Sequence, residues 1–322
     1  SFTDKSSGRE LRRPGGEPLN TFLFAEDVPF MYDNWEIEPD VMDKLKPVYG
    51  FTGRTLVSDG PVEIRLRSTY DIGDGTTLTQ DMVCYADTPR IDFHTLIDWN
   101  SPHRLLKAAF DLNLKADRAR CEIQYGAIER PTAANTSWDK AKFEVCNRNY
   151  TDLSEPDFGA ALLNDCKYGI SVRDCNLRLS LHRGGDHPDV TGDRGVHELT
   201  YALYPHEGSF SAENAAYPGY ELNVPIVSVK GKADIPSFAK IDAPNVIAES
   251  VKPAEDGSDS FVIRLYECQG SHTTANISLT APVTQAVYTN FLEDEKYPLI
   301  LENNTVSLDF RPFEIKTVRF SG

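Results

Sequence analysis

The sequence predicts an all-β protein: a large antiparallel β-sandwich at residues 1–240, then a small C-terminal β-domain at residues 241–322, with very little helix. Two observations lead to this fold class. Apolar and polar residues alternate along much of the chain, which is typical of strands with one buried face. Turn sequences rich in Gly, Pro, Asp and Ser recur about every 10 to 15 residues, as between antiparallel hairpin strands.

Two stretches in the first half carry the clearest strand pattern. Residues 61–70, PVEIRLRSTY, place apolar side chains at 62, 64 and 66, and residues 90–99, RIDFHTLIDW, repeat the alternation. We expect each of these strands to bury its apolar face. The sequence GDGTT at residues 73–77 lies between them, so we interpret it as a hairpin turn and not as a phosphate-binding loop.

Helical segments are few, and the chain changes character near residue 240. We expect one or two helical turns in EPDVMDKLKPV at 38–48, ending before Pro47, and a short helix in DFGAALLND at 157–165. Residues 231–260 are rich in Pro, Gly, Asp and Ser, which suggests a domain boundary. Short alternating segments follow it, at residues 245–251, 260–268, 274–281, 284–292, 305–310 and 314–320.

Composition excludes several classes of protein. The formal net charge of −16 repels phosphate backbones, so we expect no nucleic-acid partner. No apolar run is long enough for a transmembrane helix, and we expect no membrane partner. The first residues, SFTDKSSGRELRRPGGEP, lack the apolar core of a signal peptide. The six cysteines form no Cys-x-x-Cys pair, so we expect reduced, mostly buried thiols and no zinc ribbon.

The highest density of reactive side chains lies in TGDRGVHELTYALYPH, residues 191–206. His197 and His206 are nine residues apart on an alternating segment. On a strand that spacing separates them by roughly 30 Å and puts them on opposite faces, so they cannot share a metal ion. We therefore expect His197 to be a satisfied strand histidine and His206 to cap the strand end. The preceding polar loop, with Asp193 and Arg194, is the better candidate for a ligand contact.

No other motif specifies a reaction. A Gly-x-Ser-x-Gly nucleophile elbow is absent from the sequence. A pair of glycosidase carboxylates cannot be chosen among 49 acidic residues by spacing alone. From the residues themselves, the prediction is an acidic β-sandwich protein with one chemically interesting loop.

Several long motifs, in order along the chain, resemble glycoside hydrolase family 38, the retaining α-mannosidases. They are RELRRPGGEPLNTFLFAEDVPFMYDNWEIEP, LIDWNSPHRLLKAAFDL, EIQYGAIERPT, ALLNDCKYGI, LRLSLHRGG, HELTYALYPHEG and the terminal RPFEIKTVRF. The resemblance covers residues 8 to 319 and is greatest to the bacterial, cytosolic and vacuolar branch. It implies that this chain corresponds to the C-terminal β-domains, with a sandwich of the galactose-mutarotase-like super-sandwich type.

The resemblance also implies where catalysis lies. Family members hold their zinc ligands and aspartate nucleophile in an N-terminal domain, and no position here matches those residues. We therefore expect no catalytic residue, no metal ligand and no cofactor in this chain, with zinc bound by the catalytic domain. Alone, the chain is expected to be inactive.

Two loops are the candidate site residues that the resemblance implies. TGDRGVHE resembles a loop that reaches the sugar pocket, so Asp193, Arg194 and His197 are candidates for the pocket or the domain interface. Arg194 matches a substrate-contacting arginine of some branches, although many members of the cytosolic branch have glutamine there. NDCKYG supplies a second set of candidates, which a tight loop held by side-chain hydrogen bonds would explain equally well: Asn164, Asp165, Lys167 and Tyr168.

The implied partners are the enzyme's own N-terminal catalytic and helical domains and α-mannoside glycans, with a homo-oligomer also open. A cytoplasmic enzyme is expected, with a vacuolar or lysosome-like compartment as the alternative. Two other functions stay open: a stand-alone carbohydrate-binding module, and a structural or oligomerisation domain.

Overall fold

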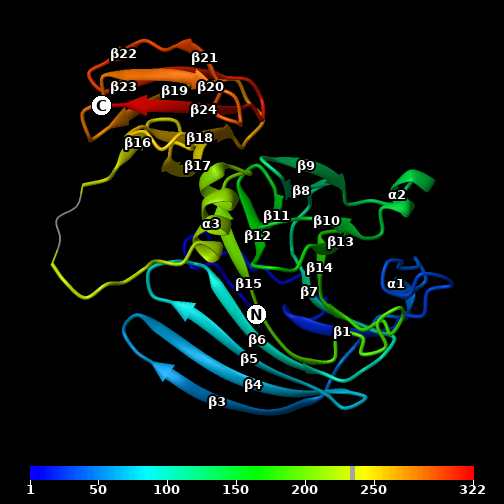
Figure 1. The fold of residues 1–322 in the computed structure, drawn as a ribbon. Helices are drawn as coiled ribbons and strands as arrows, with labels where there is room; N and C mark the ends of the chain where they lie inside the picture. Colours follow the sequence, from blue (N-terminus) through cyan, green and yellow to red (C-terminus); the bar gives the residue numbers. More distant parts are fainter. Residues whose placement is uncertain (233–235) are drawn as a thin grey trace. The chain divides into compact units, whose positions relative to one another are not determined.

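The computed structural model describes residues 1–232 and 236–322, and antiparallel strands dominate them (Figure 1). The chain divides into two compact units. Unit 1 comprises Ser1–Cys121, Ile128–Phe210 and Tyr217–Val224, and unit 2 comprises Glu122–Ala127, Ser211–Ala216 and the described part of Pro225–Gly322. The segment expected to hold the boundary includes residues 233–235, which lie outside the described residues.

Unit 1 is built around two antiparallel sheets. Within the described chain, the larger sheet has nine strands in the order β3 (Phe51–Asp59), β4 (Glu63–Gly73), β5 (Thr76–Tyr85), β6 (Ile91–Trp99), β15 (Gly195–Glu207), β12 (Phe158–Asn164), β11 (Tyr150–Ser154), β8 (Arg118–Ile123) and β9 (Gly126–Pro131). The smaller has six, in the order β10 (Val145–Cys146), β13 (Gly169–Arg173), β14 (Asn176–Arg183), β7 (Arg104–Asp111), β1 (Thr21–Glu26) and β2 (Lys46–Pro47).

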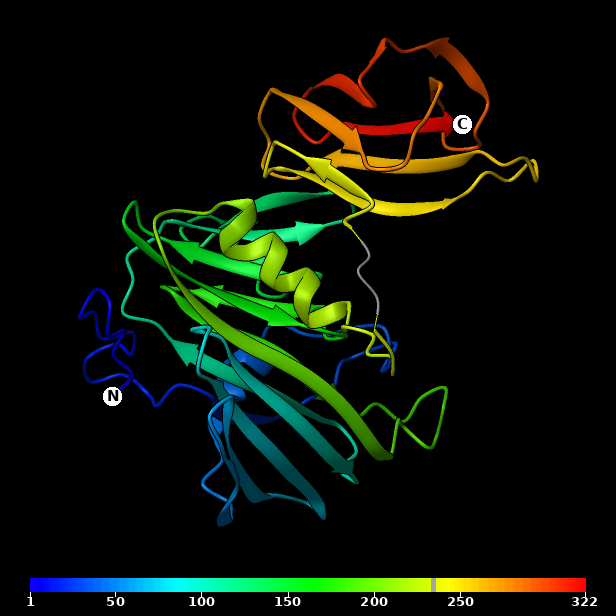
Figure 2. The same ribbon diagram turned by 90° about the vertical axis from the view of Figure 1, so that its left-hand side faces the viewer.

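The two sheets share one hydrophobic core, which confirms the predicted sandwich (Figure 2). Residues from both sheets enter it, among them Phe93 and Ile97 of β6 and Ala108 and Phe110 of β7, which alternate along their strands as the pleat requires. Phe93 of β6 stacks on Tyr201 of β15 at 5.1 Å between ring centroids, and Phe110 of β7 meets the same tyrosine edge-on. Trp99 and Tyr201 are fully buried. The predicted strand at residues 90–99 and the hairpin turn at GDGTT are both confirmed.

Helices are short, and one of the two expected helices is wrong. The structure has α1 (Val41–Lys44), as predicted before Pro47, α2 (Ser137–Ala141), a π-helical turn (Ala212–Ala216) and α3 (Tyr217–Asn223). Residues 158–164 form strand β12 and not a helix. Every residue of β12 is buried, so its sequence is a continuous apolar run without the alternation that would reveal a strand.

The expected buried face of residues 61–70 is also wrong. Val62 is 68% exposed and Ile64 is 45% exposed. Strand β4 lies second from the end of the nine-stranded sheet, whereas the facing sheet has six strands. Alternation correctly indicates a strand here, but it does not indicate that a second layer covers the apolar side.

Unit 2 contains a small sandwich of its own. Its described strands form a four-stranded sheet in the order β16 (Ala239–Ile241), β19 (Thr273–Leu279), β23 (Thr305–Phe310) and β22 (Leu301–Glu302). The second, five-stranded sheet has the order β17 (Val246–Pro253), β18 (Phe261–Glu267), β24 (Ile315–Ser321), β20 (Gln285–Thr289) and β21 (Glu295–Pro298). Residues of both sheets, including Ile263, Ile277 and Phe320, form one core. All six strand segments expected after residue 240 are confirmed.

All six thiols are free, and Cys121, Cys175 and Cys268 are buried, but Cys146 and Cys166 are exposed. No helix in the described part of the chain is long and apolar enough to cross a membrane.

Candidate pocket-edge loops

The two candidate loops, far apart in sequence, meet in the structure. Strand β12 ends at Asn164, which pairs with Tyr201 of β15, so the loop after β12 lies beside the first half of β15. The Asp165 amide donates to the Thr200 carbonyl at 3.0 Å. In return, the Thr200 amide donates to Asp165 Oδ2 at 2.8 Å. The loop after β12 therefore lies against β15 at Thr200, on the strand that follows the Arg194 loop.

Asn164 fixes the shape of the loop after β12. It is 1% exposed, its Nδ2 donates to the Arg148 carbonyl at 2.5 Å, and its Oδ1 accepts from the Lys167 amide at 2.8 Å. A buried amide with both ends satisfied holds a loop firmly because either end is costly to leave unpaired. Tyr168 is 49% exposed. The tight-loop interpretation of NDCKYG is therefore correct, and a pocket role for its residues stays a prediction.

Two histidines hold the base of the second loop. His197 Nε2 lies 2.6 Å from the Asp193 carbonyl oxygen, the geometry of an N–H donated to that oxygen. The His197 ring contacts the ring of His182 on β14 at 4.2 Å between centroids, with the two planes tilted by 47°, and the Trp99 ring lies 4.5 Å from that of His182. Burial, together with the charges of His197 and Lys167, lowers the pKa of His182 to about 3. His197 is thus a satisfied strand histidine, as expected.

His206 differs from its expected role. It does not cap a strand end but lies within β15, 6% exposed, with Nε2 2.7 Å from Asp152 Oδ2 on β11. Gly159 has no side chain and so leaves room for the His206 ring. A Cβ at this position would lie 2.5 Å from His206. The pairing is a buried structural contact within the sheet.

Arg194 projects at the end of a tightly turned loop. Gly192 has φ +55°, and a Cβ there would lie 2.0 Å from the Gly185 carbonyl oxygen, so only glycine fits. Asp193 follows with φ +53°. The Arg194 amide donates to the Thr191 carbonyl at 3.2 Å, while its side chain is exposed and makes no ion pair with any residue that the structure describes. An unpaired guanidinium offers five donors to a ligand.

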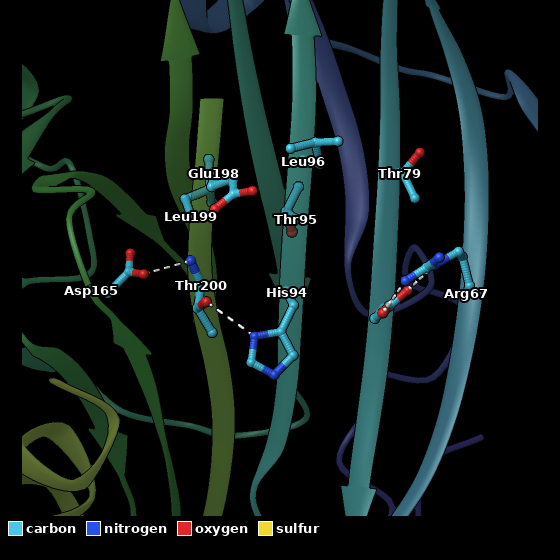
Figure 3. A pocket seen from close by; sticks show the side chains of 10 residues that line it. Arg67, Thr79, His94, Thr95, Leu96, Asp165, Glu198, Leu199 and Thr200 are labelled. Atoms are coloured by element: carbon cyan, nitrogen blue, oxygen red, sulfur yellow. Dashed lines mark hydrogen bonds and ion pairs between the residues drawn. The ribbon is translucent and has the colours of Figure 1, made fainter. Parts of the chain in front are cut away.

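A hollow of about 600 Å³ lies on the outer face of the nine-stranded sheet beside these loops (Figure 3). Arg67, Asp81, His94 and Thr200 are successive cross-strand partners on β4, β5, β6 and β15. His94 Nδ1 lies 3.2 Å from Thr200 Oγ1. Asp165 reaches the same row through Thr200, and its Oδ1 is buried with no hydrogen-bond partner among the described residues.

The row carries both signs of charge. Arg67 holds Asp81 with two hydrogen bonds, Nε to Oδ1 at 2.7 Å and Nη2 to Oδ2 at 2.8 Å. The Arg67 hydrogen bonds lower the pKa of Asp81 despite its partial burial. Sequence reasoning missed this row, although the alternation of residues 90–99 had already put His94 on the face opposite the core. The sequence does not reveal the register that brings side chains of β4, β5, β6 and β15 into one row.

These loops do not form a metal centre. Within the described parts of the chain, no three metal-ligating side chains gather in residues 164–168 and 191–198. The catalytic zinc that the resemblance implies for the whole enzyme therefore has no ligand set in these two loops.

Comparison with known proteins agrees with the architecture. Residues 1–191 match the model of the glycosyl hydrolases family 38 C-terminal domain, and residues 245–318 match that of the family 38 C-terminal beta sandwich domain. The fold is similar to the crystal structure of an alpha-mannosidase from Enterococcus faecalis V583, with a TM-score of 0.78 and 16% identity. The match covers 99% of this chain and 40% of that one.

Relatives are similar over nearly the whole chain. It is 39% identical to Alpha-mannosidase 2C1 of Homo sapiens, covering 96% of this chain and 31% of the human protein. It is 37% identical to Alpha-mannosidase G of Dictyostelium discoideum, covering 99% of this chain and 30% of that protein. The chain thus spans about a third of the length of the curated relatives it matches. It belongs to glycoside hydrolase family 38 and corresponds to that family's C-terminal β domains.

Proposed function

We propose that the chain is the C-terminal β-domain region of a zinc-dependent retaining α-mannosidase that hydrolyses terminal α-mannosides of glycans. Its relatives are named alpha-mannosidases and are about three times as long as the region they share with it. We infer that the whole enzyme contains catalytic and helical domains in addition to this chain. The single observation that carries the proposal is the family match over both β units.

In this proposal, the chain supports catalysis without performing it. The resemblance places a carboxylate nucleophile, a carboxylic acid/base and the zinc that grips the sugar hydroxyls in the catalytic domain. The contribution of this chain is to hold loop 191–198 rigidly, through Asp193, His197 and Gly192, so that Arg194 lines the edge of the sugar pocket. Holding the loop backbone in advance gains affinity because little backbone entropy remains to be lost when a ligand binds.

The loop after β12 supports the same surface. Asp165 is hydrogen-bonded to the backbone of Thr200. This contact anchors the loop after β12 to strand β15, which begins directly after Arg194. In this loop Tyr168 is exposed and Lys167 is half-buried. The proposal assigns them to the domain interface, next to the pocket edge.

Arg194 substitutions in the full-length enzyme test the pocket role. We expect Arg194→Ala to lower kcat/KM on an aryl α-mannoside by about 10- to 100-fold, the range for loss of a charge-assisted hydrogen bond. Arg194→Gln should retain most activity, because glutamine still donates hydrogen bonds. Arg118→Ala is the matched control, since Arg118 is also exposed and makes only a 3.8 Å ion pair with Glu129. An unchanged kcat/KM for Arg194→Ala would contradict the pocket role.

A stand-alone carbohydrate-binding module is the second candidate. The observation in its favour is an exposed aromatic pair, Tyr32 and Trp35, with ring centroids 6.4 Å apart. Aromatic faces of this kind stack on sugar rings. Calorimetry with mannose and α-mannobiose on the 322-residue chain and on Trp35→Ala would decide it. Saturable binding that Trp35→Ala removes would favour the module, and self-association without glycan binding would favour an oligomerisation domain.

A further inference from the structure

We propose that Asp33, His103 and Asp186 form a binding site for a first-row divalent cation, with Zn²⁺ as the best fit and Mn²⁺ as the second. The proposal concerns unit 1 alone and does not depend on the α-mannosidase activity. Within the described residues, these three form the one group whose carboxylate and imidazole ligand atoms all lie within 4.8 Å of one another.

The three residues come from three loops at the ends of strands. Asp33 lies in the segment after β1, His103 in the turn between β6 and β7, and Asp186 in the loop between β14 and β15. Backbone hydrogen bonds draw the loops together. The His103 amide donates to the Gly184 carbonyl at 2.5 Å, and the Asp186 amide donates to Asp33 Oδ2 at 2.7 Å. The framework of the site therefore exists before any ion binds.

The interior of the group contains two polar atoms that lack hydrogen-bond partners and face each other as an ion pair. Asp33 Oδ1 and His103 Nδ1 are both buried, and neither makes a hydrogen bond to a described residue. They lie 3.6 Å apart, too far for a hydrogen bond. Two ligands at about 2.1 Å from a tetrahedral ion are separated by about 3.4 Å, so an ion between these atoms would satisfy both. An orphaned buried pair costs free energy that such an ion would recover.

The third residue, Asp186, lies at the second ring nitrogen of His103. Asp186 Oδ2 lies 3.2 Å from His103 Nε2, on the side of the ring away from Asp33. A carboxylate at the second ring nitrogen orients a metal-bound imidazole and raises its basicity. The Asp186 side chain is 39% exposed, so it can also turn to supply an oxygen ligand. Water would fill the remaining positions, as it does in three-ligand sites.

Ligand type and charge select the class of ion. One imidazole and two carboxylates suit Zn²⁺ and Mn²⁺, whereas Ca²⁺ requires six to eight oxygen ligands. Two carboxylates in a chain of net charge −16 also provide the negative field that concentrates cations. A bound ion would join three loops, one of which continues to Asp193 and Arg194.

Metal titration of the 322-residue chain, freed of metal with a chelator, tests the site. Calorimetry with Zn²⁺, and separately with Mn²⁺, should give one saturable site, and thermal unfolding should shift upward with metal concentration because the ion binds the folded state. Asp33→Asn and His103→Gln should each weaken binding at least about tenfold. Ca²⁺ should not compete.

Two substitutions in the same loop serve as matched controls. His187→Gln and Asp189→Asn remove an imidazole and a carboxylate from exposed positions beside the site, and we expect each to bind like the wild type. Asp186→Asn keeps the test decisive should Asp33→Asn fail to fold, because its side chain is the most exposed of the three. The proposal is overturned by an absence of saturable Zn²⁺ or Mn²⁺ binding, or by equal affinities in site and control variants.

Discussion

His182 and His197 bring their imidazole rings to 4.2 Å between centroids, tilted by 47°, and His197 also contacts the Asp193 carbonyl of the loop that carries Arg194. Two imidazoles this close cannot both be charged without mutual repulsion. The buried member, His182, is 8% exposed and stays neutral, whereas His197 donates to the Asp193 carbonyl. The geometry of the proposed pocket edge therefore depends on the neutral form of a buried histidine.

The stability of the chain should fall as the pH is lowered from 7.5 to 5.0. His182 has a folded-state pKa of about 3, below its unfolded value of about 6.5, so the unfolded chain takes up the proton first. The stability this gives is complete above the unfolded pKa and declines below it, by about 2 kcal/mol at pH 5.0. Urea unfolding of wild type and His182→Gln at both pH values measures it. An equal pH dependence in the two proteins would show that His182 is not responsible.

Asn164→Ala should destabilise unit 1 by about 1–3 kcal/mol, because it leaves the Lys167 amide and the Arg148 carbonyl without partners in a buried setting. Urea denaturation of the 322-residue chain would measure the loss. Asn100→Ala, at an exposed position, is the control and should change stability by less than about 0.5 kcal/mol. Equal losses would mean that Asn164 does not anchor its loop.

Glu267→Gln should destabilise unit 2 by about 3 kcal/mol. The carboxylate is 0% exposed and accepts hydrogen bonds from the amides of Gln269, Gly270, Ser271 and Phe313. An amide in its place would point N–H groups at other donors.

Acid should also weaken the hydrogen bonds that Glu267 accepts and so lower the stability of unit 2. Burial raises the pKa of Glu267, but the hydrogen bonds it accepts outweigh burial and set that pKa below the ordinary value. Its stabilisation is therefore present above the unfolded pKa and lost as the pH falls through the folded one. Thermal melts from pH 6 to pH 3 on wild type, Glu267→Gln and the exposed control Glu302→Gln would show a shallower decline in Glu267→Gln alone.

We also propose that residues 241–322 fold without residues 1–240. The buried core of unit 2 draws only on residues from Ala243 to Phe320, with Ala239 and Ile241 of β16 packed at its margin. Expressed alone, residues 241–322 should unfold cooperatively in a thermal melt followed by circular dichroism. A longer fragment, 236–322, keeps β16 and tests the exact boundary. Cooperative unfolding in the longer fragment only would move the boundary before residue 239.

Sequence patterns anticipated much of this fold because alternation reports directly on a half-buried strand. Alternation correctly predicted β6 and the strands of unit 2, where one face packs in the core and the other faces solvent. The patterns failed at β12, which is buried on both faces, and they gave the wrong burial at the start of β4, where Val62 and Ile64 are exposed. In both cases the missing information was the position of a strand within the sheet, which its local sequence does not contain.

The candidate residues show the same limit. Motifs located the Arg194 loop and the Asn164 loop, but only the β12–β15 register shows that they adjoin. We expected no metal ligand in this chain because none of its positions matches the zinc ligands of the family. Asp33, His103 and Asp186 are 70 and 83 residues apart, and only the folded loops bring them together.

Turnover of an aryl α-mannoside, with Zn²⁺ added, by the 322-residue chain and by the full-length enzyme tests the central claim most directly. We expect hydrolysis by the full-length enzyme and none above background by the chain, because the proposed function places the nucleophile and the catalytic zinc ligands outside it. Robust turnover by the chain alone would contradict the claim that catalysis lies outside it. A full-length protein without α-mannosidase activity would contradict the proposed function itself.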